Sequence, residues 1–287
     1  MICVSVDVEG WHHYLWRCLK GAASKYSDSR LYDLSILRPL RSLLKVFEEY
    51  GVISTFFVVG EIAKSFPEAI EEIHNFGHEI ASHGYRHVHL TEMNKNDFEK
   101  IEKMNMDLLT KITGERPKGF RAPMFGINEE IISSLERIGY MYDSSVIPSI
   151  KIPGWFGFPD APLHPYHPSR QNISQVCEQR NFYEVPLAVF PFPRLPACGG
   201  WFLRNIGVSY IKTAAKYLLS KKYPVILYMH LQDLSLIRPK VDGVPFHGFR
   251  NCGRYALKGI ENILQNIKAR KLSIYEIIST WTPEESD

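Results

Sequence analysis

Short apolar runs alternate with segments of helical period along most of the 287-residue chain. The strand-like runs lie at 2–6, 52–59, 78–82, near 119, and at 140–143, 182–186, 225–230 and 273–275. The helical segments lie at about 37–47, 67–76, 91–113, 207–221 and 255–269, and Asn128 caps a further helix. This alternation predicts an α/β fold of roughly seven βα units around a parallel sheet.

The helical and strand periods disappear from Ser144 to about Arg180, where six prolines occur. A stretch this long with so many prolines is typical of an ordered loop or lid. An aromatic stretch at 11–16 also has no clear period, and we expect an irregular loop there. We predict one domain over residues 1–287, with a Pro-rich and aromatic loop insertion at about 144–180.

Composition narrows the class of protein. The hydrophobic content of 45% supports a sizeable core, and the net charge of +3 is spread along the chain, so nucleic acid is not an expected partner. The five cysteines are odd in number and form no CxxC pair, which argues against a disulfide framework or a structural zinc and favours a reducing compartment.

Targeting signals are not evident in the sequence. It shows no signal-peptide pattern before the first strand-like run and no apolar stretch of about 20 residues. We expect a cytoplasmic protein without a transmembrane segment. The sequence leaves open a peripheral contact with a membrane surface, and it does not determine the oligomeric state.

Candidate chemistry begins with two histidines, His83 and His87, that follow the strand-like run 78–82. If the backbone after His83 forms a helical turn, both imidazoles point the same way. Asp7 and Glu9 follow the first apolar run, and two imidazoles with one carboxylate form an open three-ligand metal site. A spaced histidine pair alone is more often a surface or core feature, so the carboxylates carry much of this prediction.

Three further polar residues, Arg121, Asp143 and His230, also follow strand-like runs. Parallel strands place their carboxyl ends on one rim of the sheet, where α/β folds bind their ligands. We therefore expect these residues to meet Asp7, Glu9 and the histidines in one cleft.

The motifs SVDVEG, SHGYRH, RAPMFG, YDSS and LYMH, in this order, resemble those of the polysaccharide deacetylase family, the NodB-type carbohydrate esterases. The resemblance extends from Ser5 to about Ile277 and implies a distorted (β/α)7 barrel. The DVE form of the first motif, with the segments EVP at 184–186 and GGWF at 199–202, is most similar to a bacterial branch associated with exopolysaccharide and surface-glycan loci.

The resemblance implies that Glu9, His83 and His87 hold a divalent metal ion, Zn²⁺ first, with Co²⁺, Ni²⁺ or Fe²⁺ as alternatives. Such a cation acidifies water and polarises an amide carbonyl. Asp7 would then be the general base, aimed by Arg121, and His230 the general acid, oriented by Asp143.

Residues expected to contact the substrate or the oxyanion form a second implied group. The backbone N–H of Met124, after Pro123, would bind the oxyanion. The side chains of His12, His13 and Trp201 are the remaining candidates for substrate contact.

Two positions depart from the common family pattern. Val8 separates Asp7 from Glu9 where the family usually has adjacent aspartates, which leaves the division of roles between these carboxylates open. Gly84 stands where many members carry Ser or Thr, which removes a hydroxyl but no ligand.

The resemblance implies a metal-dependent hydrolase that removes N-acetyl groups from amino sugars of a surface polysaccharide or its lipid- or nucleotide-linked precursor. One alternative is hydrolysis of a small cyclic or formyl amide on the same fold, as in allantoinases. Another is an inactive glycan-binding module, although no expected residue is missing. A non-haem iron oxygenase also uses two histidines and a carboxylate, but it has no need for Arg121, Asp143 and His230.

Overall fold

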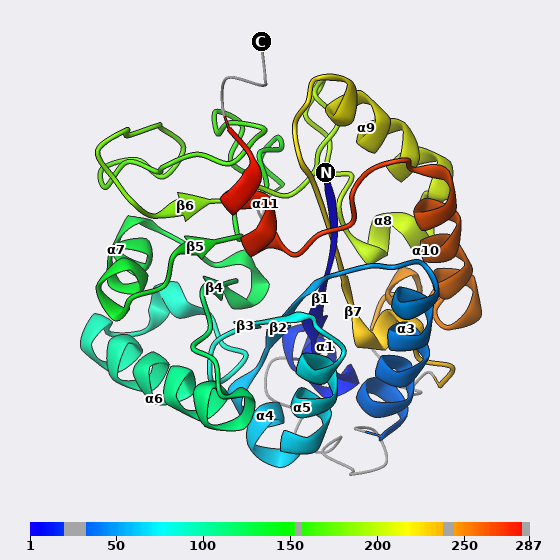
Figure 1. Cartoon of the computed structure of the whole chain (residues 1–287), viewed down its shortest axis with the longest axis horizontal. Coiled ribbons are helices and arrows are strands. Elements are labelled where there is room, and N and C mark those ends of the chain that lie inside the picture. The colour runs from blue at the N-terminus through cyan, green and yellow to red at the C-terminus, as the bar shows by residue number, and fades with distance from the viewer. Residues whose placement is uncertain (20–32, 153–156, 238–243, 283–287) are drawn as a thin grey trace.

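A seven-stranded parallel sheet forms the centre of the protein in a computed structural model that describes residues 1–19, 33–152, 157–237 and 244–282. Its strand order is β6-β5-β4-β3-β2-β1-β7, so the first strand lies beside the last. The strands are β1 (Ile2–Val8), β2 (Thr55–Val58), β3 (Glu79–Ser82), β4 (Gly119–Phe120), β5 (Tyr142–Asp143), β6 (Tyr183–Glu184) and β7 (Val225–His230). The predicted (β/α)7 arrangement is confirmed as a curled half-barrel with helices around it (Figure 1).

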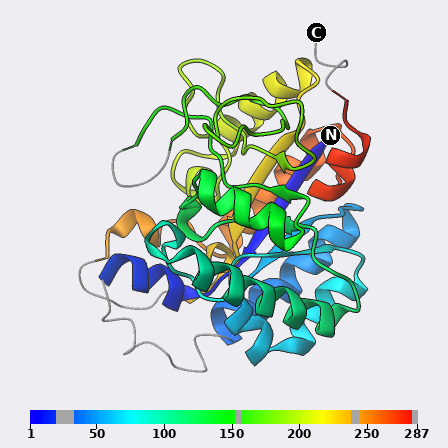
Figure 2. The same ribbon diagram turned by 90° about the vertical axis from the view of Figure 1, so that its left-hand side faces the viewer.

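Helices pack around the outer side of the curled sheet, as two views at right angles show (Figures 1 and 2). The α-helices are α1 (Trp11–Leu19), α3 (Arg38–Glu49), α4 (Gly60–Ser65), α5 (Pro67–Asn75), α6 (Lys95–Thr113), α7 (Glu129–Ile138), α8 (Gly200–Asn205), α9 (Val208–Ser220), α10 (Arg254–Asn266) and α11 (Ile274–Thr280). Shorter turns are η2 (Asp33–Leu37), η3 (Leu90–Glu92), η4 (Pro123–Phe125), η5 (Leu231–Leu234) and η6 (Phe246–Gly248). Asn128 caps α7 as predicted, by accepting a hydrogen bond from the Ile131 amide.

The side chains of β1 alternate between two cores, because successive residues of a strand point to opposite faces. Val4, Val6 and Val8 belong to the large core between the sheet and the outer helices. Cys3 instead belongs to the core inside the half-barrel. All seven residues of β1 are buried.

The predicted strand around 273–275 is wrong, since this segment begins helix α11. Ser273 accepts a hydrogen bond from the Glu276 amide, and the Glu276 carboxylate accepts one from the Ser273 amide. This reciprocal capping box fixes the start of a helix and outweighs the strand preference of the Ile-Tyr pair. Ile274 and Ile277 then pack into the core inside the half-barrel.

The irregular loop predicted at 11–16 is also wrong, because helix α1 begins at Trp11. The first turn is fixed from outside the helix, where the Trp11 amide donates to the Ser35 hydroxyl. Within the turn, the Gly10 amide donates to Nδ1 of His13. The contact with Ser35 joins segments 24 residues apart, so the local pattern does not reveal it.

Three further predictions concern the loop at 144–180, the cysteines and the absence of a membrane-spanning helix. The loop predicted at 144–180 contains no helix and no named strand in its described part, while residues 153–156 lie outside it. Three cysteines whose side chains are described, Cys3, Cys177 and Cys198, are free thiols. In the described part of the chain, no helix has the length and apolar character needed to span a bilayer.

The core provides a test of the packing. Phe47 is fully buried against Phe56, whereas Phe76 is 40% exposed. Phe47→Ala should lower the free energy of unfolding by about 3–5 kcal/mol, because it leaves a cavity. Phe76→Ala should lower it by less than about 1 kcal/mol. Urea unfolding followed by circular dichroism measures both, and equal losses would contradict this packing.

Candidate active site

The candidate site lies at the carboxyl ends of β1, β3 and β7. On β1, Ser5 and Asp7 continue the inner-face alternation that starts at Cys3, and Glu9 follows just beyond the strand. The Glu9 amide donates to the Asp7 carbonyl, which turns the chain at this point. Asp7 and Glu9 lie on the same side of this turn, with carboxylate oxygens within 4.8 Å of each other. Val8 itself packs into the outer core.

The two histidines of the SHGYRH motif lie in an irregular bend rather than in the helical turn expected from their spacing. Gly84 has a φ of +73°, in the left-handed region that glycine adopts at little cost. The bend is held from outside, since the Gly60 and Glu61 amides donate to the Gly84 and Tyr85 carbonyls. The positive φ gives a physical reason for glycine at this position.

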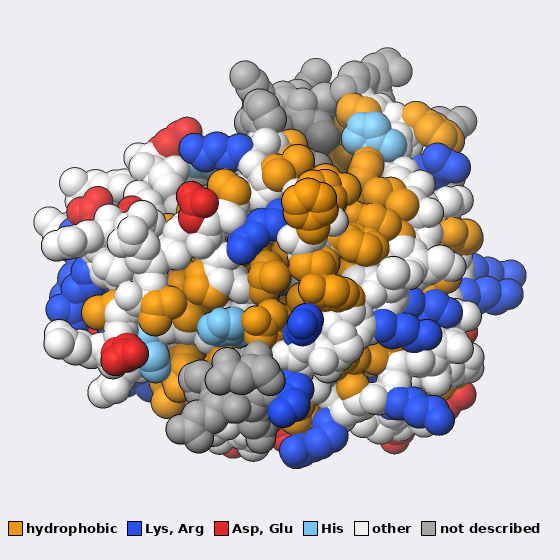
Figure 3. Space-filling view, turned by 90° about the horizontal axis from the view of Figure 1, so that it is seen from above, with side chains coloured by type: hydrophobic (Ala, Val, Ile, Leu, Met, Phe, Trp, Pro, Cys, Tyr) orange, Lys and Arg blue, Asp and Glu red, His pale blue; other side chains and the backbone are white. Residues whose placement is uncertain are grey.

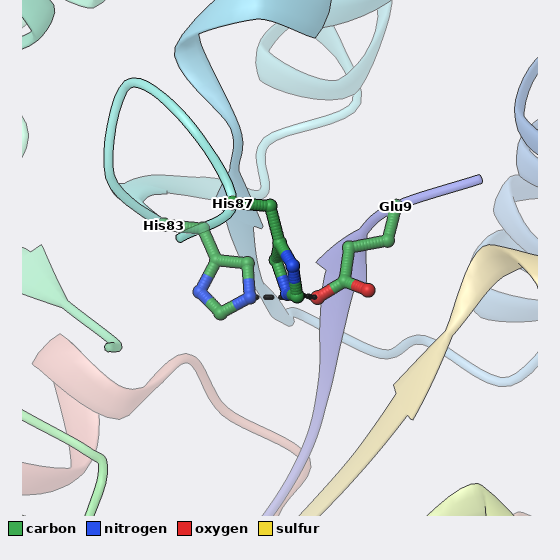
Figure 4. A group of neighbouring side chains, drawn as sticks. All are labelled: Glu9, His83 and His87. Atoms are coloured by element: carbon green, nitrogen blue, oxygen red, sulfur yellow. Dashed lines mark hydrogen bonds and ion pairs between the residues drawn. The ribbon is translucent and has the colours of Figure 1, made fainter. Parts of the chain in front are cut away.

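Glu9, His83 and His87 converge on one point (Figure 4). Oε1 of Glu9 lies 2.8 Å from Nε2 of His83 and 2.9 Å from Nε2 of His87. The three side chains are buried, and they come from segments more than 70 residues apart. The convergence predicted from the motifs is therefore present in the structure.

The donor set fits a divalent cation. Nδ1 of His83 lies 2.8 Å from the Arg121 carbonyl, so it carries the proton and leaves a lone pair on Nε2. That lone pair faces Oε1 of Glu9, and two lone pairs at this distance repel unless a proton or a cation lies between them. Two imidazoles and a carboxylate with open positions beside them suit Zn²⁺ and related ions.

Arg121 holds Asp7 in place, as predicted. Nη1 of Arg121 donates to Oδ1 of Asp7 at 2.7 Å and to the Ser5 hydroxyl at 2.9 Å. The guanidinium also donates to the Ser144 carbonyl and lies over the Phe57 ring. Both members of the ion pair are almost fully buried, so water does not compete for it.

His230 faces Asp7 across the cleft, with its Nε2 3.8 Å from Oδ2 of Asp7. Its Nδ1 lies 3.5 Å from Oδ2 of Asp233. The same oxygen accepts a hydrogen bond of 3.0 Å from the backbone amide of His230. Burial alone would lower the pKa of His230, but the carboxylates of Glu9, Asp233 and Asp7 raise it to about 9. The imidazole is thus protonated near neutral pH.

The prediction that Asp143 orients His230 is wrong. The Asp143 carboxylate instead accepts hydrogen bonds from the amide and hydroxyl of Ser145. It also shares a hydrogen bond with the buried Glu184, and burial raises the pKa of Asp143 to about 6. Asp143 ends β5, which is five places from β7, the strand of His230, in the sheet order. Asp233 lies in η5, the turn that follows β7. Asp143 supports the loop after β5.

The Asp233 carboxylate is held by Arg204 and lies close against Gly200. Nε of Arg204 donates to Oδ1 of Asp233 at 2.8 Å, and both side chains are buried. A Cβ on Gly200 would lie only 2.1 Å from Oδ2 of Asp233, so the start of α8 can approach only without a side chain. The sequence signals for this arrangement are the spacing of His230 and Asp233 after β7 and the Gly199–Gly200 pair before Trp201.

Three of the five remaining predicted residues line the cleft, a hollow of about 690 Å³ that includes open solvent. Met124, His13 and Trp201 line it, whereas His12 and Pro123 do not. Pro123 would contact a Cβ at Gly84, and His12 lies against His13 with ring centroids 3.6 Å apart. Trp201 donates its indole N–H to Nδ1 of His247.

The cleft has further wall residues that were not among the predicted site residues. They are Trp11, Tyr14, Phe125, Arg204, Tyr228, Gln232, Asp233 and Gly248. Oε1 of Gln232 has no hydrogen-bond partner among the described residues, although the side chain is buried. Aromatic walls with a few polar groups are typical of a site for a small polar molecule.

The curled parallel sheet, with acids and histidines at its carboxyl end, defines the deacetylase-like (β/α)7 class of hydrolase folds. Residues 38–142 match the model of the polysaccharide deacetylase family, and residues 144–269 match a domain of unknown function, DUF3473. Residues 38–142 are thus a region of the polysaccharide deacetylase family, as the motifs indicated. Asp7 and Glu9 precede the first matched region, and His230 lies in the second.

Comparisons with individual proteins agree with this placement. A peptidoglycan deacetylase-like protein of Gibberella zeae is 38% identical over 106 residues, which is 36% of this chain and 31% of that protein. The chain thus matches about a third of the length of such relatives. A polysaccharide deacetylase candidate from Mycobacterium smegmatis shares the fold at a TM-score of 0.67 and 22% identity, over 97% of this chain and 88% of the other. An allantoinase gives a TM-score of 0.65 at 18% identity, over 98% and 89% of the two chains.

Cation binding tests the three-ligand assignment. The metal-free protein should bind one Zn²⁺, and His87→Ala should weaken binding by more than about 100-fold, because it removes one of three ligands. Asp7→Asn should leave the affinity close to that of the unchanged protein. Competition titration against a coloured chelator measures both. A His87→Ala variant with unchanged affinity would contradict the assignment.

The Asp233 contact makes a prediction about His230. Asp233→Asn should lower the pKa of His230 from about 9 toward the ordinary value near 6.5, because it removes an adjacent negative charge. Asp143→Asn, a matched change at the residue expected from the sequence, should leave that pKa close to its original value. NMR titration of the imidazole distinguishes the two. The reverse pattern would restore Asp143 to the role.

Proposed function

We propose that the protein is a metal-dependent hydrolase that removes N-acetyl groups from amino sugars of a surface polysaccharide or of its lipid- or nucleotide-linked precursor. The observation that carries this proposal is the position of Asp7 and His230. They face each other beside the point where Glu9, His83 and His87 converge. Amide hydrolysis needs this combination of a base, an acid and an electrophile.

Asp7 acts as the general base in this proposal. A divalent ion held by Glu9, His83 and His87 would polarise the acetyl carbonyl and acidify a water molecule. Asp7, aimed by its ion pair with Arg121, takes the proton of the attacking water. The backbone N–H of Met124, on the cleft wall, is assigned to the carbonyl oxygen as it gains charge.

His230 acts as the general acid. As the carbon–nitrogen bond breaks, protonated His230 donates its proton to the amine nitrogen, so the products are acetate and a free amino sugar. Asp233 holds the imidazole in orientation and raises its pKa. Because the donor must carry its proton, activity should fall as pH rises through the pKa of His230.

The walls of the cleft suit a sugar. Tyr14 and Trp201 are partly exposed aromatic side chains of the wall, while Gln232 offers an amide oxygen without a partner in the described part. Sugars present both apolar ring faces and hydroxyl groups, so this mixture of walls matches their surface. The free thiols of Cys3, Cys177 and Cys198 support our proposal of a cytoplasmic location on the precursor side of the pathway.

Acetate release tests the proposal. The protein loaded with Zn²⁺ should release acetate from N-acetylated amino-sugar oligosaccharides, and a chelator should abolish this. Asp7→Asn should lower the rate by about 10²–10⁴-fold, because the general base is lost, while Zn²⁺ binding persists. Ring opening of allantoin without acetate release would favour the cyclic-amide alternative. Binding of acetylated glycans by a protein inert on all of them would favour the glycan-binding module.

A further inference from the structure

Three large apolar side chains are exposed beside the cleft. Leu236 is 70% exposed, Ile237 42% and Phe246 75%. We call these three residues the mouth surface. Exposed leucine and phenylalanine side chains are ordinary when scattered singly, but a group at the entrance to a binding cleft indicates an interaction site.

The mouth surface is joined directly to the cleft wall. The indole N–H of Trp11, which lines the cleft, donates to the Ile237 carbonyl at 2.9 Å. Phe246 precedes His247, which accepts the indole N–H of Trp201 on the cleft wall. A Cβ on Gly248 would lie 2.0 Å from the Tyr14 hydroxyl, so η6 and α1 are in close contact. The same two segments lie together in Figure 2.

The described chain that follows Phe246 carries basic side chains. His247, Arg250, Arg254 and Lys258 are all exposed. The described stretches 234–237 and 244–258 contain no Asp or Glu. Apolar side chains that insert below the headgroups, with basic residues beside them, are the combination that binds peripheral proteins to anionic bilayers.

We propose that the mouth surface docks on an anionic lipid bilayer, and that the cleft takes an N-acetylated amino sugar carried by a membrane lipid. This inference rests on the proposed function and selects the lipid-linked precursor among its substrates. A sugar attached to a lipid extends only a short distance from the bilayer, so the cleft must open toward the membrane. The mouth surface satisfies that condition because it borders the cleft entrance.

A rival apolar area exists at the other end of the sheet. Apolar side chains gather there with Lys and Arg at their edge (Figure 3). The hairpin 189–196 packs on α9 near that end, with Phe190 and Tyr210 rings 4.8 Å apart, and its Phe192 is 89% exposed. Ile150, 43% exposed, donates its amide to the Arg194 carbonyl of the same hairpin. Docking through this area would turn the cleft away from the bilayer.

Vesicle flotation distinguishes the two surfaces. The test variant is Leu236→Ser with Phe246→Ser, and Ile237 is retained because its carbonyl binds Trp11. The matched control is Phe192→Ser with Ile150→Ser, which removes similar apolar exposure at the other end. The unchanged protein and the control should float with phosphatidylcholine vesicles that contain phosphatidylglycerol. The affinity of the mouth variant for these vesicles should be at least about tenfold lower.

Several results would overturn the docking proposal. One is an unchanged protein that does not float. A second is a control variant that loses binding while the mouth variant keeps it. A third is a protein that self-associates through the mouth surface, seen as a dimer in sedimentation velocity that the mouth variant abolishes. Thermal melts of all variants exclude unfolding as the cause.

The substrate is tested separately from the function. Both the unchanged protein and the mouth variant should release acetate equally from a water-soluble N-acetylated oligosaccharide. From the same sugar attached through phosphate to a long isoprenoid in vesicles, the mouth variant should be slower by about tenfold. Equal rates for the two proteins on the vesicle substrate would overturn this inference and leave the proposed function intact. Absence of acetate release from both substrates would contradict the proposed function. Vesicle flotation would still test whether the mouth surface binds the bilayer.

Discussion

The alternation of side chains along β1 places the chemistry of the whole molecule. Its outward side chains, Val4, Val6 and Val8, join the core beneath the helices. Its inward side chains meet the interior of the half-barrel, first at Cys3 and then at Ser5 and Asp7, where Arg121 binds both polar groups. A shift of one residue in the register with β2 or β7 would turn Asp7 into the apolar outer core. The apolar pattern of the strand thus fixes the direction of the carboxylate.

Buried charges of both signs meet at this point, and each changes the ionisation of the others. Burial raises the pKa of a carboxylate, but the neighbouring histidines His87 and His230 lower the pKa of Glu9 well below its usual value. Burial lowers the pKa of an imidazole, but Asp7 and Glu9 raise that of His83. A divalent cation at the convergence of Glu9, His83 and His87 would replace protons on the imidazoles, so cation binding and proton release are coupled.

Much of the fold and site followed from local sequence. The apolar periods located the seven strands, and residues at their ends gave Asp7, Glu9, His83, His87, Arg121 and His230. What failed depended on contacts between distant segments or on side-chain capping. Helix α11 is fixed by a capping box whose residues lie beside the strand-forming pair Ile274 and Tyr275. Helix α1 is fixed by a contact with the distant Ser35. Asp143 had the right residue type at a strand end, but the strand order places Asp233 nearer to His230.

The two matched regions of the chain contribute different parts of the cleft. His83 and His87 come from the region of the deacetylase family model, while Trp201, His230 and Asp233 come from the region that matches DUF3473. The cleft therefore lies at a junction of two matched sequence regions, one bringing the pair His83 and His87 and the other the pair His230 and Asp233.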